Sequence, residues 1–170
     1  PKQPQTLPKA VLSVDEAERV MQQPDLTTAH GLRDRAILEV FYSTGIRRME
    51  VCNLNIEHVD VNRRVLEIRQ GKGKKDRFVP IGLRALLWIA RYVEHAREKL
   101  LLDPKEPTLF VTIHGDRMNP DSLTEYVRRY IKDSGVTKEG SCHLFRHSMA
   151  TLMHENGADI RHIQAILGHA

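Results

Sequence analysis

A glycine-rich turn between two extended runs is the feature that most limits how this chain can fold. Residues 65–70 read VLEIRQ, residues 76–81 read DRFVPI, and GKGKK lies between them. Gly71 and Gly73 allow the backbone to reverse direction, so the segment predicts a β-hairpin. A hairpin of this size gives only a small antiparallel sheet, and helices must supply the rest of the core.

Helical periodicity covers most of the remaining sequence. Ser13 and Glu16 form a capping-box pattern at the start of the first helix, and Gly45 is placed to end the second. Residues 108–113 (TLFVTI) predict a short strand or an extended piece. The expected helices span residues 13–23, 32–43, about 47–54, 84–101, from Asn119 or Asp121 to 135, about 142–155, and 158–168. We therefore expect an α+β fold, mainly α, with residues 1–12 as a linker or arm.

The composition is that of one globular domain. The chain has 170 residues, of which 41% are hydrophobic and 28% charged. No apolar run approaches the ~20 residues that cross a membrane, and no signal peptide opens the chain. Cys52 and Cys142 are the only cysteines and lie far apart in sequence. We expect reduced thiols, a cytoplasmic protein and no membrane partner.

Positive charge is concentrated around the predicted hairpin turn. Residues 69–77 hold five basic side chains and one acidic one, an excess equal to the +4 of the whole chain. Such a cluster fits a polyanion, nucleic acid first, although charge alone fits an ordinary solvated turn equally well.

The sequence HLFRH (residues 143–147) could bind either a metal ion or a phosphate. His143 and His147 share a helix face, as in the zinc-binding pattern H-E-x-x-H, but Leu144 stands where that pattern needs a glutamate. Arg146 would place a cation beside the metal and cannot become a ligand. His143 with Arg146 instead suits a phosphate, because the guanidinium fork matches phosphate oxygens and histidine can donate or move a proton. We expect no metal.

Three other segments carry similar chemistry. Arg47 follows a glycine turn at a helix start, and Glu50 lies three residues later, where it could orient the guanidinium. Lys72 lies between two glycines at the predicted hairpin tip, and His169 follows the last helix. Each has an ordinary alternative, such as a surface ion pair, a charged turn or a capping histidine. These segments and HLFRH, taken together in their order along the chain, are harder to explain by such ordinary alternatives.

In chain order, these segments resemble the tyrosine site-specific recombinases of the phage integrase family. The order is STGIRRME, GKGKKDRFVP, HLFRH and ILGHA, and the similarity extends over about residues 10–170. Within the family, these motifs look most like those of the Xer-type and integron-type enzymes. The resemblance implies that a tyrosine attacks a DNA phosphodiester to form a 3′-phosphotyrosyl link, and that the 5′-hydroxyl of a partner strand then attacks in return. No cofactor is implied.

The resemblance also assigns roles to the site residues. Arg47 and Arg146 become the catalytic arginines that hold the non-bridging oxygens of the scissile phosphate, and Glu50 an acidic residue that steadies Arg47. Lys72 becomes the lysine that protonates the leaving 5′-oxygen. The two histidines complete the set: His143 in acid–base support of the tyrosine, and His169 as a hydrogen-bond donor to the phosphate.

The family's nucleophilic tyrosine is not found at its usual place. It normally follows the Leu-Gly-His motif closely, and this chain reaches only Ala170. None of the tyrosines present matches that position; they are Tyr42, Tyr92, Tyr126 and Tyr130. We therefore interpret residues 13–170 as a catalytic domain truncated before its tyrosine, without the family's N-terminal core-binding domain. On this interpretation the chain binds DNA weakly, does not cleave it, and is a monomer, whereas the full-length protein acts as a homo- or hetero-tetramer on its recombination site.

Further DNA contacts are predicted near the hairpin and on one helix: Lys74, Lys75, Arg77, Arg128, Arg129 and Lys132. Two alternative functions share much of the same pattern. One is DNA relaxation by a type IB topoisomerase-like enzyme, and the other is a non-catalytic DNA-binding module. The complete set of Arg47, Lys72, His143, Arg146 and His169 argues against the second.

Overall fold

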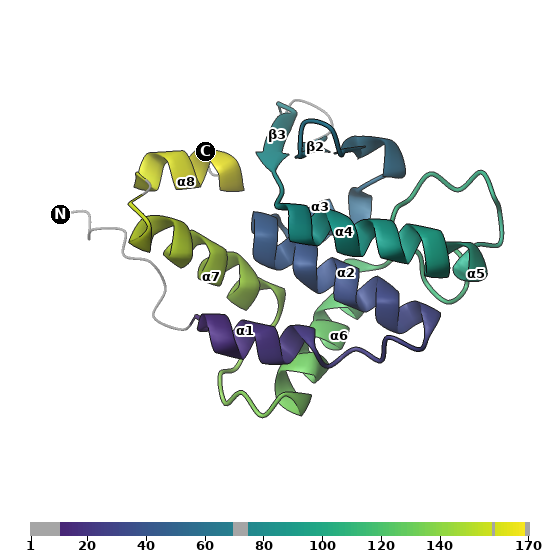
Figure 1. The fold of residues 1–170 in the computed structure, drawn as a ribbon, viewed down its shortest axis with the longest axis horizontal. Coiled ribbons are helices and arrows are strands. Elements are labelled where there is room, and N and C mark those ends of the chain that lie inside the picture. The colour runs from purple at the N-terminus through teal and green to yellow at the C-terminus, as the bar shows by residue number, and fades with distance from the viewer. Residues whose placement is uncertain (1–10, 70–74, 158, 169–170) are drawn as a thin grey trace.

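A buried central helix organises the fold. The computed structural model describes residues 11–69, 75–157 and 159–168. Helix α2 (Ala29–Thr44) runs through the middle of the molecule, with α4 on one side and α7 on another (Figure 1). Most of its residues between Gly31 and Thr44 are buried, on all faces, which is typical of a helix enclosed by others. Gly45 ends α2 in the left-handed conformation with φ of 67°, as predicted.

The remaining helices surround α2. They are α1 (Val14–Met21), α3 (Arg48–Asn53), α4 (Leu83–Tyr92), α5 (Glu98–Leu100), α6 (Pro120–Asp133), α7 (Cys142–Glu155) and α8 (Ile160–Leu167), with a short 3₁₀ turn at Ile56–His58. The predicted capping box of Ser13 and Glu16 opens α1. Asn119, one of the two predicted caps, begins α6 with Pro120 at the first helical position. Within the described part of the chain, no helix is both long and apolar enough to cross a bilayer.

The sheet has three antiparallel strands in the order β1 (Val59–Asp60), β2 (Val65–Ile68), β3 (Arg77–Pro80). The predicted hairpin is confirmed in β2 and β3, while β1 was not predicted because two residues carry no periodic signal. Leu66 lies opposite Val79, and Ile68 opposite Arg77. Arg77 therefore shares the inward face of β3 with Val79, which is fully buried.

The predicted helix 84–101 is interrupted by a π-helical segment. Residues Val93–Arg97 adopt i→i+5 geometry between α4 and α5. The buried Arg97 side chain donates hydrogen bonds to the carbonyls of Thr108 and Glu106. Periodicity did not predict this segment, because a single π-helical turn inside a helix is rare and is too short to carry a periodic pattern of its own.

The run 108–113 is an extended piece and not a regular strand. Leu109, Phe110 and Val111 are fully buried, but only isolated bridges join this segment to its neighbours, at Thr108 and Val111. Its apolar residues contribute to the core that the extended piece shares with α2 and α4, and burial of each large one is worth about 1.5–3 kcal/mol.

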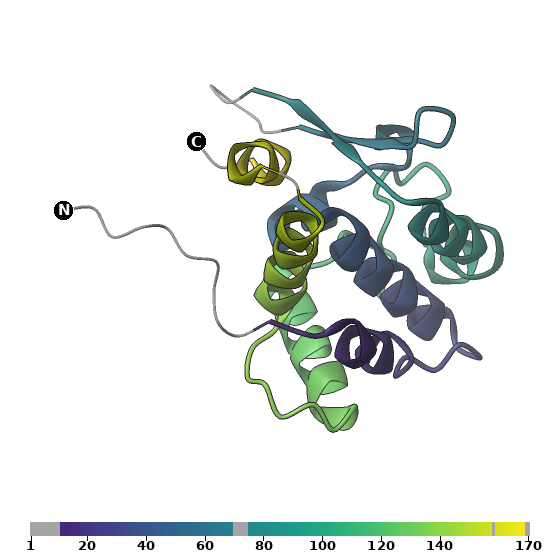
Figure 2. The same ribbon diagram turned by 60° about the vertical axis from the view of Figure 1, so that its left-hand side comes forward.

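Helix α8 brings the end of the described chain back to the sheet. It packs against α7 and against β3 (Figure 2). The turn at Gly45 after α2 and Arg47 just before α3 lie next to its C-terminal end. This arrangement collects three distant segments, namely the start of α3, the start of β3 and the C-terminal end of α8.

Candidate active site

One pocket receives both predicted catalytic arginines. It has a volume of about 400 Å³ and is lined by Ile46, Arg47, Arg48, Met49, Thr124, Ser141, Cys142, His143 and Arg146. The segments that carry Arg47 and Arg146 are far apart in sequence, and the fold joins them at the end of α2. His143 lies on the first turn of α7, three residues before Arg146, and is exposed.

The turn at Gly45 places Arg47. After Gly45, the buried Ile46 anchors the chain and Arg47 becomes the residue before α3. The backbone N–H of Arg47 donates to Oε1 of Glu50 at 2.8 Å, so this helix start is capped by a carboxylate and does not leave that N–H to an anion. The Arg47 guanidinium is 43% exposed and donates to the Gly168 carbonyl at 3.2 Å.

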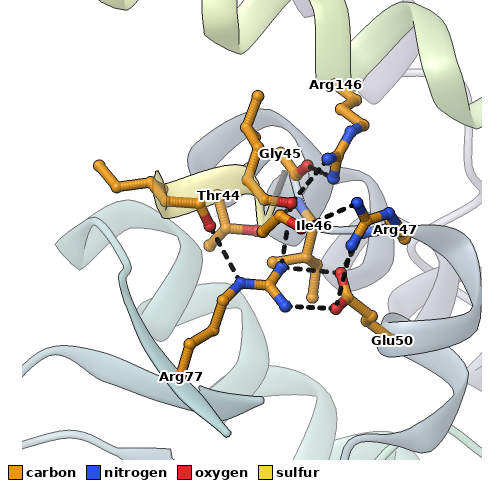
Figure 3. Close-up of polar contacts among 10 residues, drawn as sticks. Thr44, Gly45, Ile46, Arg47, Glu50, Arg77 and Arg146 are labelled. Carbon is orange, nitrogen blue, oxygen red and sulfur yellow. Dashed lines mark hydrogen bonds and ion pairs between the residues drawn. The ribbon is translucent and has the colours of Figure 1, made fainter. Parts of the chain in front are cut away.

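Two carbonyl groups orient Arg146. Its guanidinium donates to the Gly45 carbonyl and to the Leu167 carbonyl, each at 2.7 Å (Figure 3). Burial, first of all, and the charges of Arg47 and Arg77 lower the pKa of Arg146 to about 10, although the charge of Glu50 opposes the shift. The side chain is still charged at neutral pH, and its environment favours an added negative charge.

Glu50 binds Arg77 more closely than the arginine it was predicted to steady. Arg77 forms a bidentate pair with Glu50, with N–O distances of 2.5 and 2.9 Å, whereas the guanidinium of Arg47 lies 3.8 Å from the carboxylate. Burial alone would raise the pKa of Glu50, but the hydrogen bonds from Arg77 and from the Arg47 backbone outweigh it and the pKa is lowered. Glu50 is therefore ionised at neutral pH.

Arg77, which was predicted as a DNA-backbone contact, is mostly buried and makes its hydrogen bonds within the protein. Its side chain is 14% exposed, and it also donates to the carbonyls of Ile166 and Leu167. Sequence reasoning missed this placement, although a signal was available: Arg77 alternates with Val79 in the strand and with Ile81 just after it, and both of those are buried.

The other predicted site residues lie either outside the described part of the chain or on its surface. Lys72, Lys74 and His169 lie outside the described residues. Lys75 is exposed just before β3. Three predicted DNA contacts are exposed on α6, where Arg128 pairs with Glu125 on the same helix; they are Arg128, Arg129 and Lys132. Their contact with DNA stays a prediction.

Arg48 is a site residue to which the sequence analysis assigned no role. It donates to the Thr124 hydroxyl at 2.7 Å and to the Asp121 carboxylate at 3.1 Å, so it ties the start of α3 to the start of α6. Both Arg48 and Thr124 line the pocket.

The tyrosines of the chain have other partners. Tyr92 is fully buried and donates to the Leu109 carbonyl, and Tyr130 donates to the Asp34 carboxylate. Tyr126 lies beneath the Arg33 guanidinium. Within the described residues, no tyrosine lines the pocket of Arg47 and Arg146. The rings of His143 and His147 are 5.7 Å apart, and no third potential metal ligand gathers with them among the residues described.

Comparison with known proteins agrees with the resemblance. The model of the phage integrase family matches residues 10–170. The chain is 51% identical over its full length to tyrosine recombinase XerC 2 of Ralstonia nicotianae, and covers 49% of that protein. The crystal structure of XerA recombinase superposes with a TM-score of 0.84 at 35% identity, covering the whole chain and 58% of XerA. The XerH recombinase bound to its difH substrate, a pre-cleavage complex, superposes with a TM-score of 0.80 at 26% identity, covering 97% of the chain and 48% of XerH.

The chain thus spans about half the length of the curated relatives it matches. The agreement covers the fold, the family model and the full length of the chain. This protein belongs to the phage integrase family, and its similar relatives are Xer tyrosine recombinases.

Proposed function

We propose that this chain is the catalytic domain of a site-specific recombinase, which cleaves and rejoins DNA through a 3′-phosphotyrosyl intermediate. The observation that carries the proposal is the shared pocket: Arg47 and Arg146, from distant segments, line it together with His143. The family membership and the Xer relatives support the same function.

The charges of the site fit a phosphodiester. Arg47, Arg77 and Arg146 gather around one carboxylate, that of Glu50, so the described cluster carries excess positive charge. Arg47 and Arg146 each use at most two N–H groups for the contacts given above, and a guanidinium has five. The carbonyls therefore orient the two guanidinium groups and leave donors for phosphate oxygens.

The chemistry follows from this charge. A tyrosine has a pKa near 10 in water, so it attacks at neutral pH only where a positive field and a proton acceptor stabilise its anion. Two guanidiniums stabilise the equatorial oxygens as negative charge grows in the transition state, and one such contact is typically worth about 10²–10³ in rate. We assign these contacts to Arg47 and Arg146, acid–base support of the tyrosine to His143, protonation of the leaving 5′-oxygen to Lys72, and a hydrogen bond to the phosphate to His169.

The nucleophile is expected to come from a longer protein. Each of Tyr92, Tyr126 and Tyr130 is engaged in the core or against a buried charge, and Tyr42 is half-buried in contact with the core. The 170-residue chain should therefore leave DNA uncut, and we also propose that it binds DNA weakly and as a monomer.

The proposed partner is a double-stranded recombination site. The pre-cleavage complex of XerH contains its difH substrate, which supports DNA as the ligand of the similar domain. The full-length protein would work as a homo- or hetero-tetramer, as the family resemblance implies.

A nicked suicide substrate tests the proposal. The protein encoded by the complete reading frame should form a covalent DNA adduct that survives denaturation, and Arg47→Gln or Arg146→Gln should lower adduct formation by about 10²-fold or more. The 170-residue chain should form none. An adduct from the short chain would contradict the expectation that it lacks the nucleophile. If the complete protein formed no adduct, the remaining interpretation would be a non-catalytic DNA-binding module. Relaxation of supercoiled plasmid without strand exchange would indicate a topoisomerase instead.

A further inference from the structure

We propose that Arg77 is a positioning residue for DNA cleavage, which fastens α3, the hairpin and the end of α8 into one site. This inference rests on the proposed function, because it concerns the same pocket. On this proposal Arg77 does not contact DNA. It acts on Arg47 and Arg146, which we call the clamp arginines, through the Glu50 carboxylate and the carbonyls at the end of α8.

The first support is the use of the guanidinium itself. Arg77 gives two hydrogen bonds to Glu50, one to Ile166 O and one to Leu167 O, which engages four of its five N–H groups. The side chains of Arg77 and Glu50 are only 14% and 10% exposed. Little of this guanidinium remains to bind a DNA phosphate.

The second support is the C-terminal end of α8. The last carbonyls of a helix have no intrahelical partner and carry partial negative charge. Here they accept from three guanidiniums: Ile166 and Leu167 from Arg77, Leu167 also from Arg146, and Gly168 from Arg47 (Figure 3). Arg77 shares Leu167 O with Arg146 and shares Glu50 with Arg47. Arg77 is thus linked to Arg146 through the Leu167 carbonyl oxygen and to Arg47 through the Glu50 carboxylate.

The third support is Gly168, which leaves room for Arg77. Gly168 adopts φ of 76°, and a Cβ there would lie 2.7 Å from Cζ of Arg77. The guanidinium packs directly on the α8 cap, so the glycine meets both a backbone and a packing requirement. A lysine at position 77 could not make the same contacts, because an ammonium lacks the planar fork.

The segments joined by Arg77 are those that carry the proposed catalytic groups. Arg77 follows Lys72 by five residues, Glu50 follows Arg47 by three, and Gly168 directly precedes His169. A displacement of about 1 Å in a reacting group can cost about 10²-fold in rate. Loss of Arg77 should therefore slow cleavage although Arg77 does not touch the substrate.

The test uses the complete protein on the nicked suicide substrate, with Arg77→Gln, Arg77→Lys and the control Arg84→Gln. The Arg84 guanidinium also donates several hydrogen bonds to carboxylates, those of Glu18 and Glu39, but on the α1–α2–α4 side of the molecule. We expect single-turnover cleavage at saturating protein to fall about 10- to 100-fold in both Arg77 variants, with the DNA Kd changed less than about threefold. Arg84→Gln should lose thermal stability and cleave within about threefold of wild type.

Each outcome decides the proposal. Cleavage by folded Arg77→Gln within about threefold of wild type would overturn it, and so would a loss of cleavage that only follows DNA affinity or the folded fraction. If Arg77→Gln does not fold, Arg77→Lys decides by the same criteria; rescue of the rate by lysine would show that charge alone suffices and would overturn the positioning role of the fork. Failure of the wild-type protein to form any adduct would instead refute the proposed function.

Discussion

Replacement of Glu50 by glutamine should expose how much of the site depends on one carboxylate. Glu50 accepts hydrogen bonds from the Arg47 backbone N–H and from both terminal nitrogens of Arg77. A glutamine keeps one acceptor oxygen but turns its NH₂ toward a guanidinium, which is also a donor. In addition, Arg47, Arg77 and Arg146 would lose the carboxylate that offsets their charge.

The magnitude follows from burial and from the bonds that remain. Removing one partner of a buried ion pair costs about 3–5 kcal/mol. Arg77 keeps its contacts with Ile166 O and Leu167 O, and the pair is slightly exposed, so we expect about 2–3 kcal/mol in the free energy of unfolding. In a chain of this length each kcal/mol lowers Tm by about 2–4 °C, so Glu50→Gln should lower it by about 4–12 °C.

The assay is calorimetric or circular-dichroism unfolding of the 170-residue chain, with Glu125→Gln as the control. Glu125 also pairs with an arginine, Arg128, but both side chains are more than half exposed. Its replacement should cost less than about 0.5 kcal/mol. Equal Tm values for Glu50→Gln and Glu125→Gln would refute the reasoning.

The pH dependence gives an independent check of the same carboxylate. The pKa of Glu50 is lowered from its ordinary 4.5 in the folded protein, so its ionised form stabilises the fold. That contribution is fully present above pH 4.5 and is lost as the pH falls through the lower, folded-state pKa. The stability difference between wild type and Glu50→Gln should shrink over that acidic range and stay constant near neutral pH.

Three further predictions concern single residues. Gly168→Ala should lower the free energy of unfolding by about 1–2 kcal/mol in urea titration, because alanine is disfavoured at φ of 76° and its Cβ would collide with Arg77; unchanged stability would contradict this packing. Tyr130→Phe should cost about 1.5–3 kcal/mol, since it removes the hydrogen bond to the Asp34 carboxylate, while cleavage by the complete protein should persist; loss of adduct at full folding would make Tyr130 a catalytic candidate. Burial raises the pKa of the Cys52 thiol to about 12, so Cys52 should resist iodoacetamide at about pH 8 until the protein unfolds, as mass spectrometry can follow; rapid labelling of the folded chain would contradict that burial.

Local sequence determined much of the secondary structure. Ser13 with Glu16, Gly45 and Asn119 mark helix ends by capping chemistry that involves only near neighbours, and all three ends appear in the structure. The hairpin was predictable for the same reason, because alternation and turn glycines act over a few residues. The π-helical segment at Val93–Arg97 and the two-residue strand β1 were not, because contacts with distant residues and not local preference stabilise them.

The side chains of Arg47, Lys72, His143, Arg146 and His169 suit a phosphate because of their charge and hydrogen-bond donors, and their order along the chain resembles that of the phage integrase family. Sequence alone could not decide which group each one meets. Glu50 lies three residues from Arg47, yet its closest partner is Arg77, which the β2–β3 register turns inward beside the end of α8. Covalent neighbours set residue type and local backbone, whereas the balance between charges depends on distances through space, which only the packed tertiary structure fixes.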